Sequence, residues 1–459
     1  MKTRELLNLG IPRGPLLKTA QIATAAAAAA GQNKRAIRAS MLELMAQPQA
    51  YLNHMQFGEL AAALRETLDV RARFDGRQDA APFCRWGNDL EAGAIAQMEN
   101  ACRLPVAVCG ALMPDAHQGY GLPIGGVLAT RGTVIPFAVG MDIACRMKLT
   151  VLDLPLSLLE DRQEVLAAAL ERETAFGVGA SFSQRKNHPV MDRDWSLTAL
   201  TRRYRDKAWS QLGTSGSGNH FVEFGVLTLP EDDLGLAAGS YLALLSHSGS
   251  RGTGGLIAEH FSRIAQERHP ELPRELQALA WLDLDSEAGQ EYWWAMELMG
   301  AYAAANHALI HGDMARRLGA EVLLDVENHH NFAWKEELDG EEVIVHRKGA
   351  TPAGAGVLGI IPGSMATAGY LVRGLGESSS LASASHGAGR KMSRKAARQT
   401  FTWQQARAFL AARNVRLLSA GLDEVPMAYK DIEEVMAAQA ELVTPVARFD
   451  PRLVKMAAD

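Results

Sequence analysis

Pro105-Val-Ala-Val-Cys109 is a short apolar and β-branched run, and the sequence Met-Pro-Asp-Ala-His-Gln-Gly follows it at 113–119. A run of this kind predicts a β-strand, and the proline and glycine after it predict a turn or loop. A second β-branched and apolar run, Val343 to His346, is likewise followed by a glycine, Gly349. Helical patterns alternate with these runs at 157–173, 255–268, 287–318 and 403–413. No Pro/Ser-rich linker divides the segments, so we predict one mixed α/β body.

The N-terminal part of the chain differs from this body. Residues 16–75 predict helices, because alanine dominates from Thr19 to Ala30 and apolar side chains recur at helical spacing from Met41 to Met45. We therefore predict a helical extension at 1–75 and a single domain at 76–459. Two roles remain open for the extension, a docking site for a protein partner and a cap over the core, and we favour the cap.

The composition is that of an ordinary folded domain. The chain has 459 residues, 47% of them hydrophobic and 22% charged, which excludes a disordered or collagen-like protein. Its 47 Lys and Arg and 52 Asp and Glu give a formal net charge of −5. The electrostatic field of the whole molecule therefore does not attract nucleic acid in general. A polyanion would have to bind at a local basic patch.

Three segments are candidates for binding an anion. Two are clusters of cations, and the third, Ile361-Pro-Gly-Ser-Met-Ala-Thr-Ala-Gly369, leaves two interpretations open, a phosphate cradle and a tight turn. The clusters are Arg390, Lys391, Arg394, Lys395 and Arg398, and Arg202, Arg203, Arg205 and Lys207.

The four cysteines, Cys84, Cys102, Cys109 and Cys145, form no C-x-x-C pair and predict no disulfide framework. The longest uncharged stretch near the start, residues 19–33, is too short and too weakly apolar to cross a bilayer. We therefore expect a cytoplasmic protein without a membrane partner.

Thirteen histidines are present, and six of them lie in glycine-rich or otherwise unusual local sequences. Glycine lets backbone amides approach a ligand closely, so such loops are suited to shaping a site. A lone histidine is more often a core residue than a ligand, but six in such settings favour metal binding or proton transfer. The six are His117, His220, His247, His330, His346 and His386.

Asp142 and Cys145 place a carboxylate and a thiol three residues apart. By itself this spacing is more typical of a turn with a buried thiol. Together with His220, His247 and His330 it predicts a mixed O, S and N site for a divalent transition ion such as Mn²⁺, Zn²⁺, Fe²⁺ or Co²⁺.

Read in order, eight sequence blocks resemble the RtcB family of RNA-splicing ligases, and the resemblance runs from about Cys84 to the end of the chain. The blocks are Met-Pro-Asp-Ala-His-Gln-Gly-Tyr-Gly-Leu-Pro-Ile-Gly (113–125), Gly-Met-Asp-Ile-Ala-Cys (140–145), Gly-Thr-Ser-Gly-Ser-Gly-Asn-His-Phe (213–221), His-Ser-Gly-Ser-Arg-Gly (247–252), His-Asn (330–331), His-Arg-Lys-Gly-Ala (346–350), Pro-Gly-Ser-Met (362–365) and Ser-His-Gly-Ala-Gly-Arg (385–390).

The resemblance implies an α+β fold, in which one large catalytic domain carries mixed or antiparallel β-sheets flanked by helices. It implies two Mn²⁺ ions bridged by Cys145, and His386 as the nucleophile that attacks the α-phosphate of GTP. The remaining metal ligands it implies are Asp142 and His220 at one ion and His247 and His330 at the other. The nucleotide-binding residues it implies are Asn219, Glu223, Ser364, Arg390, Tyr429 and Lys455, with His346, Arg347 and Lys348 as a basic block nearby.

The activity implied by the resemblance is a GTP- and Mn²⁺-dependent ligation, in tRNA splicing or RNA repair. It joins RNA 3′-phosphate or 2′,3′-cyclic phosphate ends to 5′-hydroxyl ends through a covalent histidine–GMP and an activated RNA 3′-ppG end. The implied partners are RNA with such ends and GTP, and an archease-like activating protein is a further candidate.

Two residues depart from the family pattern Asp-Ile-Gly-Cys-Gly-Met, since Ala144 and Arg146 flank the cysteine in place of glycines. We expect the Arg146 side chain close to the site, where it contacts RNA phosphate or alters metal loading. Two other functions stay open: a metal-dependent phosphoesterase that opens cyclic phosphates without ligation, and a non-catalytic RNA-binding protein. The intact block at 385–390 argues against the first, and the five predicted metal ligands argue against the second.

Overall fold

The computed structural model describes residues 1–11, 15–72, 76–77 and 79–458. The chain forms two compact units, one of Met1–Gly76 with Gln266–Gln277 and the other of Arg77–Ala265 with Ala278–Asp459. The predicted boundary between residues 75 and 76 involves a residue outside the described ones, so the division into domains at that point stays a prediction.

The first unit is built around helices with a core of their own. The predicted helical region is interrupted, because Gly31 takes a φ of +88° after the second helix and the Asn33 side chain caps the next by accepting from the Ala36 amide at 2.9 Å. Leu6, Met41 and Phe57 are among its fully buried residues. Its helices are α1 (Thr3–Asn8), α2 (Pro15–Ala29), α3 (Lys34–Ala46) and α4 (Gly58–Ala72), with a short 3₁₀ turn at Pro48–Tyr51.

The second unit contains a large sheet. Its strands lie in the order β13-β14-β17-β6-β7-β5-β9, with β16 beside β17. All pairs in it are antiparallel except β16 with β17, which agrees with the predicted α+β class. The strands are β5 (Arg146–Leu152), β6 (Phe221–Leu229), β7 (Gly239–Ser248), β9 (Val322–His329), β13 (Leu358–Ile361), β14 (Gly369–Gly374), β16 (Arg416–Ser419) and β17 (Val443–Met456).

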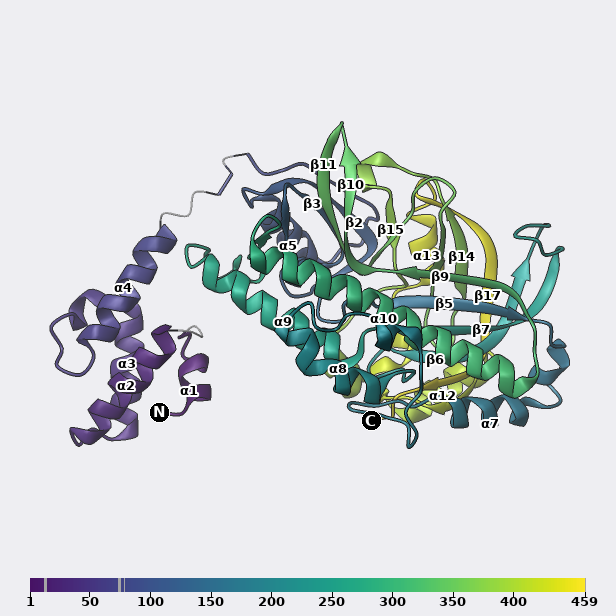
Figure 1. Cartoon of the computed structure of the whole chain (residues 1–459), viewed down its shortest axis with the longest axis horizontal. Helices are drawn as coiled ribbons and strands as arrows, with labels where there is room; N and C mark the ends of the chain where they lie inside the picture. Colours follow the sequence, from purple (N-terminus) through teal and green to yellow (C-terminus); the bar gives the residue numbers. More distant parts are fainter. Residues whose placement is uncertain (12–14, 73–75, 78, 459) are drawn as a thin grey trace. The chain divides into compact units, whose positions relative to one another are not determined.

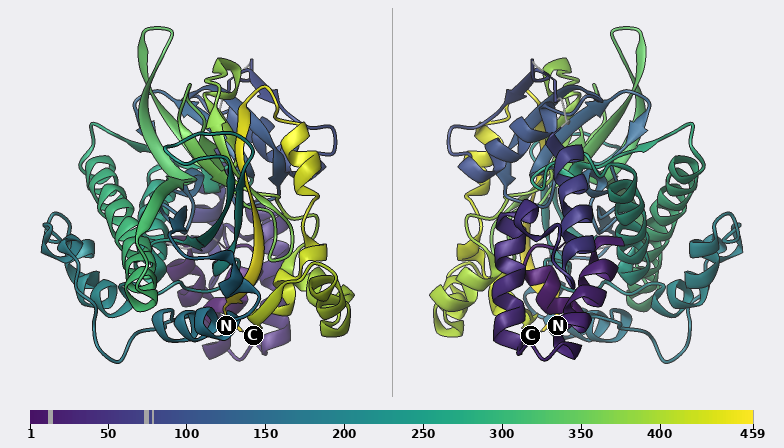
Figure 2. Two further views of the ribbon diagram at one scale, coloured as in Figure 1. Left: turned by 90° about the vertical axis from the view of Figure 1, so that its right-hand side faces the viewer. Right: turned by 90° about the vertical axis from the view of Figure 1, so that its left-hand side faces the viewer.

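A second sheet has the order β1-β2-β3-β11-β10, and its β10–β11 hairpin extends beyond the neighbouring strands (Figure 2). Two small two-stranded sheets complete the unit. The strands are β1 (Phe83–Arg85), β2 (Ala107–His117), β3 (Ile124–Thr130), β10 (Asn331–Leu338) and β11 (Glu341–Lys348), and in the small sheets β12 (Ala350–Pro352) with β15 (Ser383–Ser385) and β4 (Thr133–Val134) with β8 (Leu282–Asp283).

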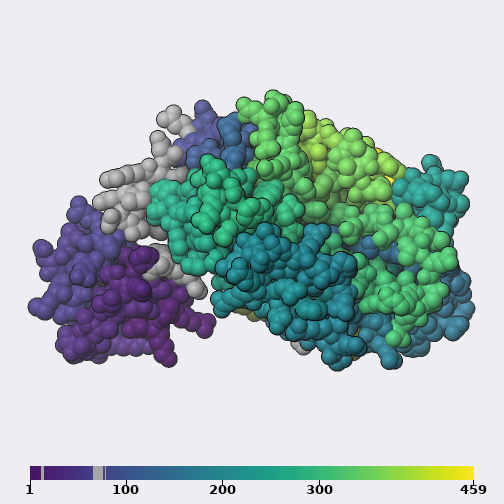
Figure 3. All heavy atoms as spheres, viewed as in Figure 1, coloured from purple at the N-terminus to yellow at the C-terminus, as the bar shows by residue number. Residues whose placement is uncertain are grey.

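Helices cover the large sheet. The longest, α10, lies across β5 and β7 (Figure 1), and in the space-filling view α10 and the neighbouring helical segments hide the strands on this face (Figure 3). The helices are α5 (Ala92–Cys102), α6 (Pro136–Val139), α7 (Gln163–Glu173), α8 (Ala199–Gln211), α9 (Arg251–Arg268), α10 (Glu287–Leu318), α11 (Arg394–Thr400), α12 (Trp403–Ala411) and α13 (Ile432–Ala437). Among the described residues, no helix is both long enough and apolar enough to cross a membrane.

Strand β5 shows how the sheet separates its two faces. Its apolar residues Met147, Leu149 and Val151 are buried in one hydrophobic cluster. The alternate residues turn to the side of α10, where Thr150 hydrogen-bonds to His311 at 2.6 Å and Arg146 to the carbonyl of Gly300 at 3.1 Å. This alternation is the period-two pattern of a strand covered on both faces.

Candidate metal and nucleotide site

Four of the predicted ligands meet at one edge of the large sheet. Cys145 directly precedes β5, His220 directly precedes β6, His247 lies near the end of β7 and His330 directly follows β9. Strand β5 pairs antiparallel with β7 and β9, and β6 pairs antiparallel with β7. The starts of β5 and β6 therefore lie beside the ends of β7 and β9, which brings distant parts of the chain together.

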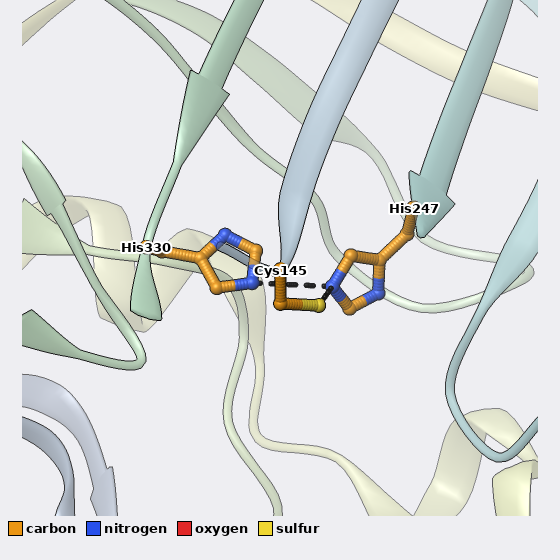
Figure 4. Close-up of side chains that lie close together, drawn as sticks. All are labelled: Cys145, His247 and His330. Atoms are coloured by element: carbon orange, nitrogen blue, oxygen red, sulfur yellow. Dashed lines mark hydrogen bonds between the residues drawn. The ribbon is translucent and has the colours of Figure 1, made fainter. Parts of the chain in front are cut away.

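The side-chain atoms of these residues converge on two groups that share one sulfur. Sγ of Cys145 is 3.1 Å from Nε2 of His247, which is 3.2 Å from Nε2 of His330. Sγ is also 3.4 Å from Nε2 of His220, which is 3.0 Å from Oδ2 of Asp142. Figure 4 shows the Cys145 side chain between the imidazoles of His247 and His330. Each group could hold one metal ion.

Burial favours the neutral form of the imidazoles, which is the form that binds metals. Burial lowers the pKa of His247 to about 3 and that of His330 well below its usual value. Burial and the charge of Arg251 also lower the pKa of His220. Nδ1 of His247 donates to the carbonyl of Asn219 at 3.1 Å, which leaves the lone pair of Nε2 directed at the sulfur. Neutral imidazoles with this orientation fit a transition-metal site.

The thiol and the carboxylate of the site fit a cation as well. Burial and the nearby Asp142 carboxylate raise the pKa of the Cys145 thiol well above its usual value, whereas a coordinated thiol is deprotonated. Burial opposes ionisation of Asp142, but its hydrogen bond with His220 and the charge of Arg251 outweigh this and lower its pKa. A mixed sulfur, nitrogen and oxygen donor set of this kind suits divalent transition ions.

The loop that carries Asp142 and Cys145 is held by Asn331. Its Nδ2 donates to the carbonyl of Asp142 at 3.2 Å, its carbonyl accepts from the amide of Ala144 at 2.7 Å, and its Oδ1 accepts from the amide of Gly349 at 2.8 Å. Ala144 has a φ of 56°, a left-handed conformation that glycine adopts without strain. This conformation is a physical reason for the glycine that the family pattern has at the position of Ala144.

A buried carboxylate orients the predicted nucleophile. His386 directly follows β15, and its Nδ1 lies 2.7 Å from Oδ2 of Asp115 on β2. Asp115 has no exposed surface. The ring of His386 lies 4.9 Å from that of His330, centroid to centroid, so Nε2 is left to act on a ligand beside the metal groups. Reasoning from sequence missed Asp115, although it stands two residues before the singled-out His117.

Most of the predicted site residues line one cavity of about 590 Å³. His117, which the sequence singled out, is also at its wall. The predicted residues that line the cavity are Asp142, Cys145, Asn219, His220, Glu223, His247, His330, Ser364, His386, Arg390 and Tyr429.

The predicted nucleotide-binding residues that line the cavity differ in their surroundings. Glu223 is buried, which raises the pKa of its carboxyl well above the usual value. The guanidinium of Arg390 donates to Glu424 at 2.9 Å and lies over the ring of Tyr429, 5.1 Å from its centroid. The hydroxyl of Ser364 is 2.9 Å from that of Thr367, within the turn at 361–369.

Three predicted residues are not brought to the cavity. Lys455 donates to the carbonyl of Leu170 at 3.2 Å and does not line the cavity. His346 is fully buried within the sheets, and Arg347 forms an ion pair with Glu336. Of the predicted basic block, only Lys348 reaches the cavity.

The expected contact of Arg146 with RNA phosphate does not fit its placement. Its side chain does not line the cavity and instead donates to Glu327 at 3.0 Å and to the carbonyl of Gly300 at 3.1 Å. The cause is the alternation of β5, which turns residue 146 to the α10 face. Arg146 therefore links β5, β9 and α10 behind the metal ligands.

The two predicted basic clusters also differ. In the first, Arg394 and Arg398 each lie 3.0 Å from a carboxylate oxygen of Asp423, an acidic partner outside the segment that carries the cluster. The second lies on α8, where Arg202, Arg203 and Lys207 are exposed. The first cluster is thus partly neutralised beside the cavity.

Comparisons with known proteins show which family the chain resembles. A family model described as tRNA-splicing ligase RtcB matches residues 97–201 and 187–456. The RNA-splicing ligase RtcB of Escherichia coli (strain K12) is 36% identical over 394 residues, covering 79% of this chain and 94% of the relative. The tRNA-splicing ligase RtcB of Nanoarchaeum equitans is 32% identical, covering 78% and 90%, and the RNA-splicing ligase RtcB of Mycobacterium bovis is 33% identical, covering 77% and 98%.

Proposed function

The chain belongs to the RtcB family of RNA-splicing ligases, and from this premise we propose that it joins RNA 3′-phosphate or 2′,3′-cyclic phosphate ends to 5′-hydroxyl ends, using GTP and Mn²⁺. The observation that carries the proposal is the pair of ligand groups sharing Cys145, next to a histidine that Asp115 orients. Family membership supports RNA as the substrate.

The two ligand groups would hold the metal ions. Asp142, Cys145 and His220 would bind one, and Cys145, His247 and His330 the other. When bound, Mn²⁺ would neutralise charge on the phosphates and stabilise the leaving oxygen. The thiolate is the reason to favour Mn²⁺ over Mg²⁺, which prefers oxygen ligands.

His386 performs the first chemical step of the proposed reaction. Asp115 keeps the proton on Nδ1, so Nε2 carries the lone pair that attacks the α-phosphorus of GTP. A nitrogen–phosphorus bond forms while the bond from that phosphorus to the oxygen of the β-phosphate breaks. Pyrophosphate leaves, and His386 carries GMP.

Two further displacements complete ligation. An oxygen of the RNA 3′-phosphate attacks the phosphorus bound to His386, the nitrogen–phosphorus bond breaks, and the RNA end becomes 3′-ppG. The 5′-hydroxyl of the second RNA then attacks the RNA-side phosphorus, loses its proton, and releases GMP. A 2′,3′-cyclic phosphate end must first be opened by water to give a 3′-phosphate.

The nucleotide is proposed to lie among the predicted residues that line the cavity. Asn219, Ser364 and Arg390 would contact phosphates, and Glu223 and Tyr429 would contact guanine. Glu223 suits this role because its carboxyl oxygens can accept hydrogen bonds from the N–H groups of guanine. We leave Lys455 out, because it is hydrogen-bonded at the end of α7.

A ligation assay with and without GTP tests the proposal. RNA bearing a 2′,3′-cyclic phosphate and RNA bearing a 5′-hydroxyl are incubated with the protein and Mn²⁺, and Cys145→Ala serves as the control for metal dependence. A joined product that requires GTP supports ligation. Opening of the cyclic phosphate at every GTP concentration without joining would instead identify the alternative phosphoesterase.

Three finer points stay proposals. The natural RNA, from tRNA splicing or from repair, is to be identified from RNAs crosslinked to the protein in cells. An archease-like activator is tested by its effect on the rate of the adduct-forming step, and a cytoplasmic location by cell fractionation.

A further inference from the structure

Two exposed apolar side chains stand at the mouth of the cavity. Tyr120 is 79% exposed and Met141 is 42% exposed, and both line the cavity. Phe137 lines the same cavity. Single exposed apolar residues are ordinary, but two beside a polar reaction centre form a surface on which a ligand can pack. Neither residue has a part in holding metal or in the proposed chemistry at His386.

Two contacts hold the backbone that presents Tyr120. The Nζ of Lys348 donates to the carbonyl of Tyr120. The following residue, Gly121, has a φ of +71° and packs so closely that an added Cβ would lie 2.8 Å from the carbonyl oxygen of Ala278. The exposed ring is therefore carried by an ordered segment, which limits the entropy lost when a ligand stacks on it.

The same lysine contacts both the backbone of Tyr120 and the loop that carries Asp142. The side-chain carbons of Lys348 lie along Gly140, two residues before Asp142, at 3.8 Å from where a Cβ would stand. The next residue, Gly349, is so close to the nucleophile that a Cβ there would lie 3.1 Å from Cε1 of His386. A ligand held near His386 would thus share the cavity with Lys348 and with the exposed ring of Tyr120.

We propose that Tyr120 is a stacking platform for the terminal nucleobase of the RNA whose 3′-phosphate enters the cavity. The inference rests on the proposed ligase function and names how its substrate is held. Stacking on an aromatic ring accepts every base, because each base has a π-face, so it suits an enzyme that reads an end and not a sequence. Met141 and Phe137 line the same cavity and offer further apolar surface.

Binding of RNA without GTP tests the platform, because no guanylate transfer takes place. The probe is a short 5′-fluorescein RNA with a 3′-phosphate, titrated with protein and Mn²⁺ and followed by anisotropy. We expect Tyr120→Ala to weaken binding about tenfold, the scale of one lost base stack. Tyr120→Phe keeps the ring and should bind as the unaltered protein does. Trp294→Ala removes a partly exposed aromatic residue that does not line the cavity, and serves as the matched control.

A second RNA identifies the contact as the terminal base. The same probe with an abasic 3′-terminal nucleotide should bind the unaltered protein about tenfold more weakly. The Tyr120→Ala protein should bind the abasic probe and the intact probe with equal affinity. The substitution has already removed the contact that the missing base would make. Losses that multiply, or a Tyr120→Ala protein with unchanged affinity, would overturn the proposal.

The step that uses GTP alone separates this inference from the proposed function. Formation of the guanylate adduct should have the same KM for GTP in Tyr120→Ala as in the unaltered protein. A raised KM for GTP would mean that the ring holds guanine, and would overturn the inference while leaving the ligase function intact. Absence of any adduct in the unaltered protein would refute the proposed function itself, which the binding experiment does not measure.

Discussion

Oδ2 of Asp115 lies 2.7 Å from Nδ1 of His386 and also accepts the backbone amide of the same residue at 3.2 Å. Two hydrogen bonds to one oxygen fix both the ring and the backbone of His386, the proposed nucleophile. A carboxylate at Nδ1 also fixes the tautomer, with the lone pair on Nε2. The pair therefore sets the orientation of the ring that we propose to attack GTP.

Asp115→Asn should slow formation of the guanylate adduct by roughly 10³-fold, because an amide that donates to Nδ1 favours the wrong tautomer of the histidine. The measurement is the single-turnover rate with GTP and Mn²⁺. The bound Mn²⁺ should stay as in the unaltered protein, since Asp115 belongs to neither ligand group. An unchanged rate would show that the carboxylate does not orient His386 in the reaction.

Substitution of the ligands should remove metal in a defined pattern. Because Cys145 belongs to both groups, Cys145→Ala should lose both bound Mn²⁺ ions, whereas His220→Ala and His330→Ala should each lose one. The metal content is measured by elemental analysis after dialysis against Mn²⁺, with His188→Ala as a control outside the ligand groups. Loss of only one ion from Cys145→Ala would contradict a shared sulfur.

The sequence was most informative where local rules decide the structure. The helix predicted at 287–318 has the bounds of α10, which begins after the capping Ser286 and ends before the left-handed Gly319. The predicted metal ligands stood out because glycine-rich loops set them apart from core histidines. Their meeting at one sheet edge, however, depends on the pairing of β5, β6, β7 and β9, which no local pattern states.

The positions of some side chains depend on contacts between distant parts of the chain. Arg146 was expected close to the site, where it contacts RNA phosphate or alters metal loading, but its direction follows from the face of β5 and from Glu327, which lies 181 positions away in the chain. Lys455 is held by the end of α7, far from it in sequence. The contact of Asp115 with His386 joins β2 to the loop after β15 and was equally invisible to local reasoning.

Arg146→Met should lower the free energy of unfolding by about 2 kcal/mol, since it removes two hydrogen bonds of a buried charged group while keeping much of the packing. Affinity for RNA should not change, because the side chain does not line the cavity. Arg131→Met, which breaks the exposed ion pair with Glu341, should leave stability nearly unaltered. Weaker RNA binding by Arg146→Met would contradict this prediction and would support the contact with RNA phosphate expected from the sequence.

His346 should make the protein less stable in mild acid. Its Nδ1 lies 3.1 Å from the carbonyl of Leu128 and its Nε2 accepts from the amide of Ile135 at 2.9 Å, and burial lowers its pKa to about 4. The unfolded chain takes up a proton near the ordinary histidine pKa of about 6.5, but the folded chain does so only near 4. Stability is therefore lost as the pH falls through this window, by about 1.4 kcal/mol per pH unit for this group.

Denaturant unfolding at pH 7 and pH 5 measures this contribution. His346→Gln has no group that titrates there, so its stability should fall less between the two pH values, by a margin of about 2 kcal/mol. An equal loss in the variant and the unaltered protein would show that His346 is not a source of the acid sensitivity.

The most direct measurement is to locate the guanylate. The unaltered protein is incubated with GTP and Mn²⁺, digested without exposure to acid, and its peptides are mapped by mass spectrometry. We predict GMP bonded to His386, and no adduct in His386→Ala or when Mn²⁺ is withheld. An adduct on another residue, or none at any metal concentration, would contradict a nucleophilic histidine beside the paired ligand groups.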